Sequence, residues 1–255
     1  MTDLDLTPFL ARGFGEKSDR LIANIKVEGI DKYHTLSQIR LAPETAGFLY
    51  GAFTPLTVTY HRGSRPRLEK IVAEVLSGVE SSPRAQVLAL LEWTAQVIRH
   101  AMHVKGETPV DRALSEEALL DSGWGYCNEK ARILVSLAQI AGYPGRMVSI
   151  YHSTGIHGHM VSEIHVEGEW AMADPTFAVV VPKNKGRWAS AKDLSWEASL
   201  NSTTDEVYRA GILKMDRLHG PGMNVPDSIL VRDRPCRMFA QIGISNYPIF
   251  SFPKG

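Results

Sequence analysis

The sequence is poor in cysteine and has no long apolar segment, and each absence excludes a class of protein. Two cysteines in 255 residues are too few for a disulfide framework, and they form no Cys-x-x-Cys pair of the zinc-knuckle or thioredoxin kind. No stretch approaches the roughly 20 consecutive apolar residues of a membrane span. The N-terminal residues also lack the basic and apolar regions of a secretory signal. We therefore expect no membrane partner and a cytoplasmic location.

A net charge of one sign is absent as well. Lys plus Arg and Asp plus Glu both number 28, so the formal net charge is zero and no overall field attracts nucleic acid. Hydrophobic residues make up 44% of the chain, which is enough to bury the core of one globular body. The composition therefore predicts a globular protein without a nucleic-acid partner, and it leaves the oligomeric state open.

Helical and strand patterns follow one another along the chain. Residues 66–79 and 82–102 have helix-like apolar spacing, and on the second helix we interpret Trp93 as core packing and His100 as a solvated edge. A shorter helix is expected within 107–123. Segments rich in β-branched residues predict further strands at 24–30, 55–63, 228–233 and 238–244. Helical patterns in the C-terminal part predict two short helices at 190–199 and 204–214.

The most informative patterns come directly after these helices. Residues 126–141 predict a helix whose apolar stripe ends before Gly142. Glu167–Gly168 has the character of a two-residue hairpin turn between two strands. Three consecutive strands are expected in this part of the chain, at 145–153, 159–166 and 169–174.

Cys127 stands at the first turn of the predicted 126–141 helix. Unpaired backbone N–H groups and the positive end of the helix dipole favour an anion there, so the position favours a thiolate. Gly125 suits a close turn before the cysteine because it has no side chain. A nucleophilic cysteine also needs a base and a group that orients that base.

The predicted hairpin supplies both groups. If Glu167 and Gly168 form the turn, each residue of one strand faces a residue of the other, and the two residue numbers of every facing pair add up to the same total. That register makes His159 and Asp174 diagonal neighbours on one face, with backbones about 7–8 Å apart and side chains within reach. A bulge would shift the register by one residue and remove the pairing. The register selects His159 over the other candidate histidines, which are His152, His157 and His165.

Two stretches, "GYCNEKARILVSLAQIAGYPGR" at 125–146 and "HMVSEIHVEGEWAMADPTF" at 159–177, resemble the core of the transglutaminase-like superfamily. The shared elements are a Gly-x-Cys that opens a helix, a Gly-x-Pro-x-Arg that ends it, a histidine with an acidic residue four later, and a Trp-x-x-x-Asp-Pro-Thr strand. The resemblance covers about residues 85–177 and implies a papain-like α+β fold, in which the nucleophile's helix packs on an antiparallel β-sheet. The matching residues are Gly125, Cys127, Gly142, Pro144, Arg146, His159, Glu163, Trp170, Asp174, Pro175 and Thr176.

The resemblance also implies an activity. A triad of Cys127, His159 and Asp174 would attack an amide or peptide bond and form a thioester. Water resolves the thioester in a peptidase or amidase and an amine resolves it in a transglutaminase, and the sequence does not choose between them. The substrate would be a peptide, a protein or a small amide, and no cofactor is implied. The catalytic core would occupy 66–180, between a β-rich N-terminal extension at 1–65 and a C-terminal α/β extension of the same globular body at 181–255.

Other interpretations of these residues remain open. His157, His159 and His165 share strand parity, which would suit a metal, but their spacing fits no zinc motif and we expect no metal ligands. Glu163 is either a hydrogen-bond partner in the site or a charged edge residue. The alternative function is that of a non-catalytic binding or scaffold module with the same fold.

Three aromatic residues and the second cysteine also receive an interpretation. Trp124 and Tyr126 flank the cysteine and are expected near the substrate, whereas Trp170 is expected to pack opposite His165. Cys236 follows a proline and lies in no motif that supplies a catalytic partner, so we interpret it as an ordinary thiol.

Overall fold

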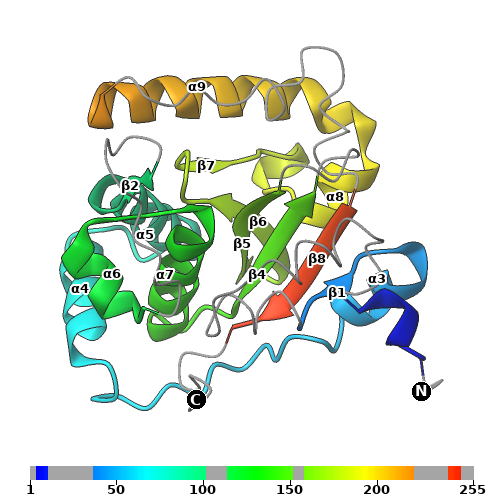
Figure 1. Cartoon of the computed structure of the whole chain (residues 1–255), viewed down its shortest axis with the longest axis horizontal. Helices are drawn as coiled ribbons and strands as arrows, with labels where there is room; N and C mark the ends of the chain where they lie inside the picture. Colours follow the sequence, from blue (N-terminus) through cyan, green and yellow to red (C-terminus); the bar gives the residue numbers. More distant parts are fainter. Residues whose placement is uncertain (1–3, 11–36, 102–113, 152–157, 221–240, 248–255) are drawn as a thin grey trace.

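The centre of the molecule is a six-stranded sheet in which all neighbouring strands are antiparallel (Figure 1). The computed structural model describes residues 4–10, 37–101, 114–151, 158–220 and 241–247. Across the sheet the order is β1-β8-β4-β5-β6-β7, so a strand from the C-terminal segment lies between β1 and β4. The strands are β1 (Ile39–Arg40), β4 (Gly145–Tyr151), β5 (Gly158–Val166), β6 (Glu169–Asp174), β7 (Val179–Val180) and β8 (Gln241–Asn246).

Helices surround this sheet, and a short parallel pair of strands lies among them. In Figure 1 four helices, α4 to α7, gather on one side of the sheet, and α9 runs across the molecule beyond β7. The parallel pair is β2 (Arg99–His100) and β3 (Trp124–Gly125). The α-helices are α3 (Pro43–Leu49), α4 (Pro66–Leu76), α5 (Pro83–Val97), α6 (Glu116–Ser122), α7 (Cys127–Ile140), α8 (Ala191–Trp196) and α9 (Asn201–His219), and short 3-10 helices occupy Thr7–Phe9, Asn184–Gly186 and Ala198–Leu200.

The β5–β6 hairpin has the predicted register. Val166 faces Glu169, and the residue numbers of the following facing pairs add up to the same total, as a two-residue turn requires. Glu167 and Gly168 have φ angles of 51° and 85°, and a type I′ turn needs positive φ at both positions. Gly168 adopts this conformation without the strain that a side chain would cause. The predicted hairpin is therefore confirmed.

Helix α7 begins and ends where the sequence predicts. It starts at Cys127 and ends at Ile140, and Gly142 follows in the left-handed region with φ of 94°. Its side chains pack on β4 and β5 of the antiparallel sheet. The predicted fold class, an α+β fold in which the helix of Cys127 packs on an antiparallel sheet, is confirmed.

The burial of α7 goes further than its sequence pattern suggests. The pattern predicts one apolar face, but every residue from 128 to 138 is buried. The reason is that α7 lies between the sheet on one side and the helices α4, α5 and α6 on the other. Three charged side chains, those of Glu129, Lys130 and Arg132, are consequently enclosed in the protein.

One expectation for the flanking segments is wrong. Residues 55–63 pair with no strand of the sheet, and Leu56 is 51% exposed. β-Branched residues form a strand only where a neighbouring strand is available for pairing, and the described structure offers none to this segment. The helix expected at 204–214 is confirmed as part of α9, which extends beyond it at both ends and spans Asn201–His219.

Other expectations for the flanks are met in part or stay untested. The strand expected at 238–244 is observed as β8 from Gln241 onward. The strands expected at 24–30 and 228–233 lie outside the described residues. The division of the chain at 65 and 180 stays a prediction.

A buried ion pair joins the central strands to two helices. Arg146 on β4 and Glu163 on β5 face each other in the sheet, are both fully buried, and approach to 2.7 Å between Nη2 and Oε2. The guanidinium also lies over the rings of Trp170 and Tyr50, at 4.0 and 4.6 Å from their centroids. Glu163 Oε1 accepts hydrogen bonds from the Tyr50 hydroxyl and from the backbone N–H of Ala191. The interpretation of Glu163 as a charged edge residue is therefore wrong, because it is a central structural group.

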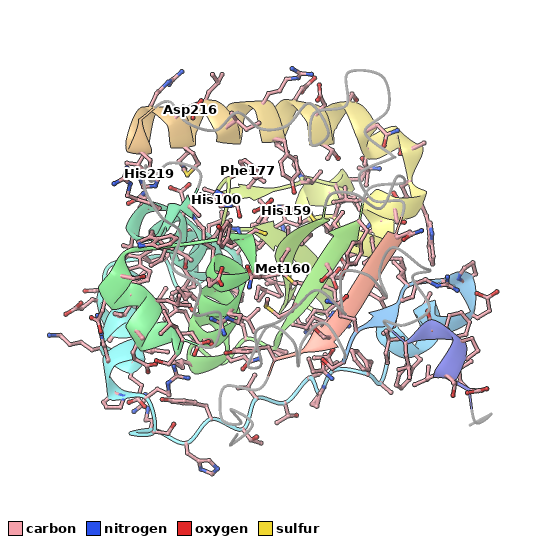
Figure 2. The ribbon with its side chains drawn as sticks, viewed as in Figure 1. His100, His159, Met160, Phe177, Asp216 and His219 are labelled. Atoms are coloured by element: carbon pink, nitrogen blue, oxygen red, sulfur yellow. The ribbon has the colours of Figure 1, made fainter. Side chains whose placement is uncertain are left out.

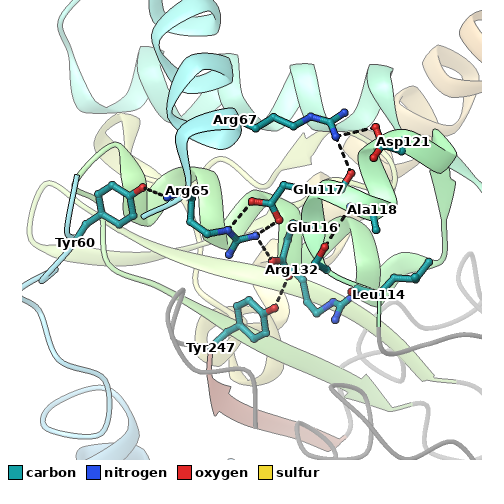
Figure 3. A network of polar contacts seen from close by, with 11 residues as sticks. Tyr60, Arg65, Arg67, Leu114, Glu116, Glu117, Ala118, Asp121, Arg132 and Tyr247 are labelled. Carbon is teal, nitrogen blue, oxygen red and sulfur yellow. Dashed lines mark hydrogen bonds and ion pairs between the residues drawn. The ribbon is translucent and has the colours of Figure 1, made fainter. Parts of the chain in front are cut away.

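A second polar network fixes α6, the helix that precedes Cys127 (Figure 3). Arg65, just before α4, pairs with Glu116 at 2.8 Å and also with Glu117. Glu116 is fully buried and accepts a further hydrogen bond from the hydroxyl of Tyr247, which follows β8. The network ties α4, α6 and the end of β8 together, and so anchors the segment that leads into α7.

The Arg146–Glu163 pair gives a testable stability difference. Glu163→Gln leaves a buried arginine charge without its counter-charge, so the free energy of unfolding should fall by about 3–5 kcal/mol. Glu169→Gln is the matched control, because Glu169 pairs with Arg187 at the surface, where both side chains are more than 40% exposed. It should cost less than about 1 kcal/mol. Urea unfolding of both variants measures the difference, and equal losses would contradict the structural role of Glu163.

Candidate active site

His159 and Asp174 form a close buried pair on the hairpin. His159 Nε2 lies 2.6 Å from Asp174 Oδ2. Asp174 is fully buried, and its second oxygen accepts a hydrogen bond of 2.8 Å from the backbone N–H of Thr176. Both carboxylate oxygens are therefore held, and the carboxylate in turn holds the imidazole in one orientation. The structure thus brings together the two residues that the hairpin register selects.

Cys127 reaches this pair from the start of α7. Its side chain acts on His159 by raising the pKa of the imidazole, and the residue is partly exposed. Because Asp174 engages Nε2, the second ring nitrogen, Nδ1, is the one left for the sulfur. The imidazole is therefore bonded to Asp174 and influenced by Cys127, and Cys127 itself is partly exposed.

The imidazole is held in its charged form by its neighbours. Burial alone lowers the pKa of His159, but the Asp174 carboxylate and the Cys127 side chain raise it, with the net result of about 10. An ordinary histidine has lost its proton well below that value. At neutral pH the ring therefore carries a positive charge beside the Asp174 carboxylate.

The first turn of α7 is fixed by its own backbone and by Glu129. The carboxylate of Glu129 accepts a hydrogen bond of 2.8 Å from the backbone N–H of Tyr126, the residue before the helix. Gly125 packs against this side chain so closely that a Cβ atom there would lie 2.9 Å from Glu129 Cβ. A side chain at position 125 would therefore have no space, which explains why this residue is a glycine. The turn presents the backbone N–H of Cys127 at the positive end of the helix.

Aromatic packing extends from the site to α9. The ring of Phe177 lies 5.6 Å from that of His159 and 5.5 Å from that of Tyr208 on α9. Burial and the nearby Asp174 carboxylate raise the pKa of Tyr208 well above its ordinary value. In Figure 2 Phe177 lies between His159 and α9. Helix α9 therefore closes the buried side of the His159–Asp174 pair.

Sequence reasoning missed several neighbours of the site. His100 is neither helical nor solvated as expected, since α5 ends at Val97 and His100 lies in β2, 8% exposed, with its ring 6.1 Å from that of Tyr126. Phe177 and Tyr208 had no distinguishing pattern. Lys130 did have a distinguishing pattern. It follows Cys127 by three residues, and this spacing places two side chains on one face of a helix.

The remaining candidates are placed as follows. Trp124 in β3 and Tyr126 before α7 are both partly exposed beside Cys127, and a role in substrate binding stays a prediction. His165 packs against Trp170 with ring centroids 5.2 Å apart, so the packing interpretation of Trp170 is confirmed. His152, His157 and Cys236 lie outside the described residues.

The described part of the chain shows neither a metal site nor a membrane-spanning helix. Within it, no cluster of three or more His, Cys, Asp or Glu side chains is arranged to hold a metal ion. Among the helices of the same ranges, none is both long and apolar enough to cross a membrane.

The comparison with protein families agrees with this geometry. Residues 70–175 match the model of the transglutaminase-like superfamily. Over this segment the chain is similar to a transglutaminase-like core. The segment contains Cys127, His159 and Asp174, whereas α9 and β8 lie beyond it.

Solved structures and curated proteins were compared as well. A candidate cysteine protease from Cytophaga hutchinsonii is 20% identical, with 55% of this chain and 44% of that chain covered and a TM-score of 0.38. The periplasmic domain of TgpA from Pseudomonas aeruginosa is 22% identical, with 48% and 46% covered and a TM-score of 0.38. A TGase is 14% identical, with 50% and 36% covered and a TM-score of 0.37. The chain thus spans less than half the length of each of these proteins, and no curated protein matches it.

The close packing at Gly125 gives a prediction for the geometry of the site. In Gly125→Ala the new methyl group would displace Glu129 and loosen the first turn of α7, so alkylation of Cys127 at pH 6 should slow several-fold. The control is Gly47→Ala on α3, where a Cβ atom meets nothing within 4 Å. That change should be neutral or stabilise slightly, because alanine favours a helix. Equal alkylation rates for Gly125→Ala and the wild type would contradict the packing argument.

Proposed function

We propose that this protein is a cysteine-dependent acyl-transfer enzyme that acts on an amide or peptide bond. Cys127 is the nucleophile, His159 the base and acid, and Asp174 the group that orients the imidazole. The observation that supports this most strongly is the imidazole itself, which lies 2.6 Å from the Asp174 carboxylate through Nε2 and whose pKa is raised by both Asp174 and Cys127. The core of the transglutaminase-like superfamily at 70–175 supports the same class of chemistry.

The first half of the reaction forms a thioester. The thiolate of Cys127 attacks the carbonyl carbon, and the negative charge moves to the carbonyl oxygen. The backbone N–H of Cys127 at the start of α7 is one donor for that oxygen. Imidazolium at His159 then gives its proton to the leaving amine, the C–N bond breaks, and the acyl group stays on sulfur. Asp174 stabilises the positive charge of the ring before this transfer.

The second half of the reaction depends on the acceptor. Neutral His159 removes a proton from water or from an amine, the acceptor attacks the thioester, and the thiolate leaves. Water gives a peptidase or amidase, and an amine gives a transglutaminase-like transferase. The partly exposed Cys127 leaves room for either acceptor, and Trp124 and Tyr126 are the aromatic groups proposed to contact the substrate.

The proposed substrate is a peptide, a protein or a small amide, and the proposed location is the cytoplasm. The chemistry above requires no metal or organic cofactor, since the triad supplies the nucleophile and every proton transfer. A non-catalytic scaffold would have no use for a charged imidazole held against a partly exposed cysteine, so the enzyme is the function that the geometry supports best.

An acyl-enzyme experiment tests the proposal. The protein is incubated with p-nitrophenyl acetate, a generic acyl donor, and digested for peptide mass spectrometry. An acetyl group should accumulate on the peptide of Cys127 and far less on that of Cys236, and Cys127→Ala should show none. Adding an amine such as glycinamide then separates acyl transfer from hydrolysis by the product formed. Equal acetylation of both cysteines would leave the scaffold function as the better account.

Removing the charge of Asp174 tests the orienting role. Asp174→Asn should lower the acylation rate of Cys127 by about 10²–10⁴-fold, because the imidazolium loses its counter-charge and its fixed orientation. Asp205→Asn is the control, since Asp205 pairs with Arg209 on the outer part of α9. It should react at the wild-type rate. A wild-type rate in Asp174→Asn would remove Asp174 from the mechanism.

A further inference from the structure

Lys130 is a buried amine that the proposed mechanism does not use. It lies on α7 three residues after Cys127 and has no exposed surface. An ammonium group costs free energy when it leaves water, so full burial of a lysine calls for compensation. In the described part of the chain, no carboxylate forms an ion pair with it.

The compensation comes from the C-terminal end of α5. Lys130 Nζ donates hydrogen bonds to the carbonyl oxygens of Ile98, at 2.6 Å, and Ala95, at 3.2 Å. These are the last carbonyls of the helix, where its dipole is negative. His219 at the end of α9 lies 3.0 Å from the same Ala95 oxygen. The amine is therefore held in one place by groups of fixed geometry.

Both negative groups that act on this amine belong to the candidate active site. The charges of Asp174 on β6 and Cys127 on α7 favour the ammonium form. Burial outweighs them and lowers the pKa of Lys130 from 10.5 to about 7. On α9, burial likewise lowers the pKa of His219, and the charges of Lys130 and Arg99 lower it further. Electrostatic coupling is mutual, so a positive charge on Lys130 also acts on these two groups.

We propose that Lys130 is a positioning residue of this site, whose buried ammonium stabilises the thiolate of Cys127 and thereby sets how much nucleophile is present near neutral pH. The inference rests on the proposed function, because it needs a thiolate to act upon. It explains why a charge that costs stability lies beneath the first turn of α7, where an apolar side chain would fill the same space.

The first experiment removes the charge and measures Cys127. Alkylation of Cys127 by iodoacetamide is followed against pH in the wild type, Lys130→Met and Lys130→Gln. Both variants should move the midpoint of the profile upward by about one pH unit, because both lack the positive charge. Lys214→Met is the control, since Lys214 pairs with Glu92 at the surface. Its profile should match that of the wild type.

The two lysine variants separate charge from hydrogen bonding. Glutamine keeps N–H donors for the carbonyls of α5, so a purely structural clamp predicts that Lys130→Gln retains the wild-type profile; that result would overturn the inference. Methionine removes the cost of burying a charge. At pH 6, below the pKa of Lys130 in the folded protein, that cost is fully present, and Lys130→Met should resist urea at least as well as the wild type.

A second measurement requires no substitution of Lys130 in the test protein. Isotope-labelled lysine side chains are titrated by NMR, and the signal of Lys130 is assigned by its loss in Lys130→Arg. In Cys127→Ala the midpoint of Lys130 should fall by about one pH unit, because the thiolate charge is gone. In Glu92→Gln it should not move. An unchanged midpoint in Cys127→Ala would overturn the inference.

The outcomes distinguish this inference from the proposed function. If wild-type Cys127 reacts rapidly at pH 6 and Lys130→Met leaves that profile unchanged, only the role of Lys130 fails. If wild-type Cys127 reacts like an ordinary thiol, with a midpoint of about 8.5, the thiolate is absent and the proposed function fails with it.

Discussion

The contact between His159 and Asp174 is the constraint on which the site depends. Its 2.6 Å distance is set by the register of the β5–β6 hairpin, and that register is set by a two-residue turn with positive φ at both positions. A slip of one residue would turn the histidine to the other face of the sheet. The turn at Gly168 therefore determines chemistry at the far end of the same two strands.

Buried charge is the second theme of the structure, and it has two purposes. Arg146 and Glu163 neutralise each other and join β4 and β5 to the helices that cover them. Around Cys127 the charges are arranged differently, because the two buried groups near it, His159 and Lys130, are both bases. In the first case burial fixes the fold. In the second, we propose that it prepares a nucleophile on a helix enclosed from two sides.

Much of the site could be predicted because its determinants are local. The start of α7 at Cys127 and the hairpin register follow from short patterns, namely a helix with a glycine after its end and a two-residue Glu-Gly turn. The partner of Glu163 could not be predicted in this way. Arg146 faces it across β4 and β5, but the longer connection between these strands does not specify a register.

The residues that sequence reasoning missed depend on tertiary packing. The burial of Lys130 could not be predicted from the sequence, because it results from α4, α5 and α6, which cover α7. His100 was placed on a helix that ends three residues earlier, where the chain turns into β2 to pair with β3. Tyr208 comes from α9, beyond the segment that matches the family, and no periodic pattern connects it to Asp174.

The measurement that tests the central claim most directly is the pH dependence of Cys127 alkylation in the wild type and in His159→Ala. Peptide mass spectrometry follows Cys127, and Cys236 serves as the internal reference. The account predicts that wild-type Cys127 reacts well below the ordinary thiol midpoint of about pH 8.5. In His159→Ala this property should be lost. Identical profiles in the two proteins would show that no thiolate–imidazolium pair exists and would contradict the account.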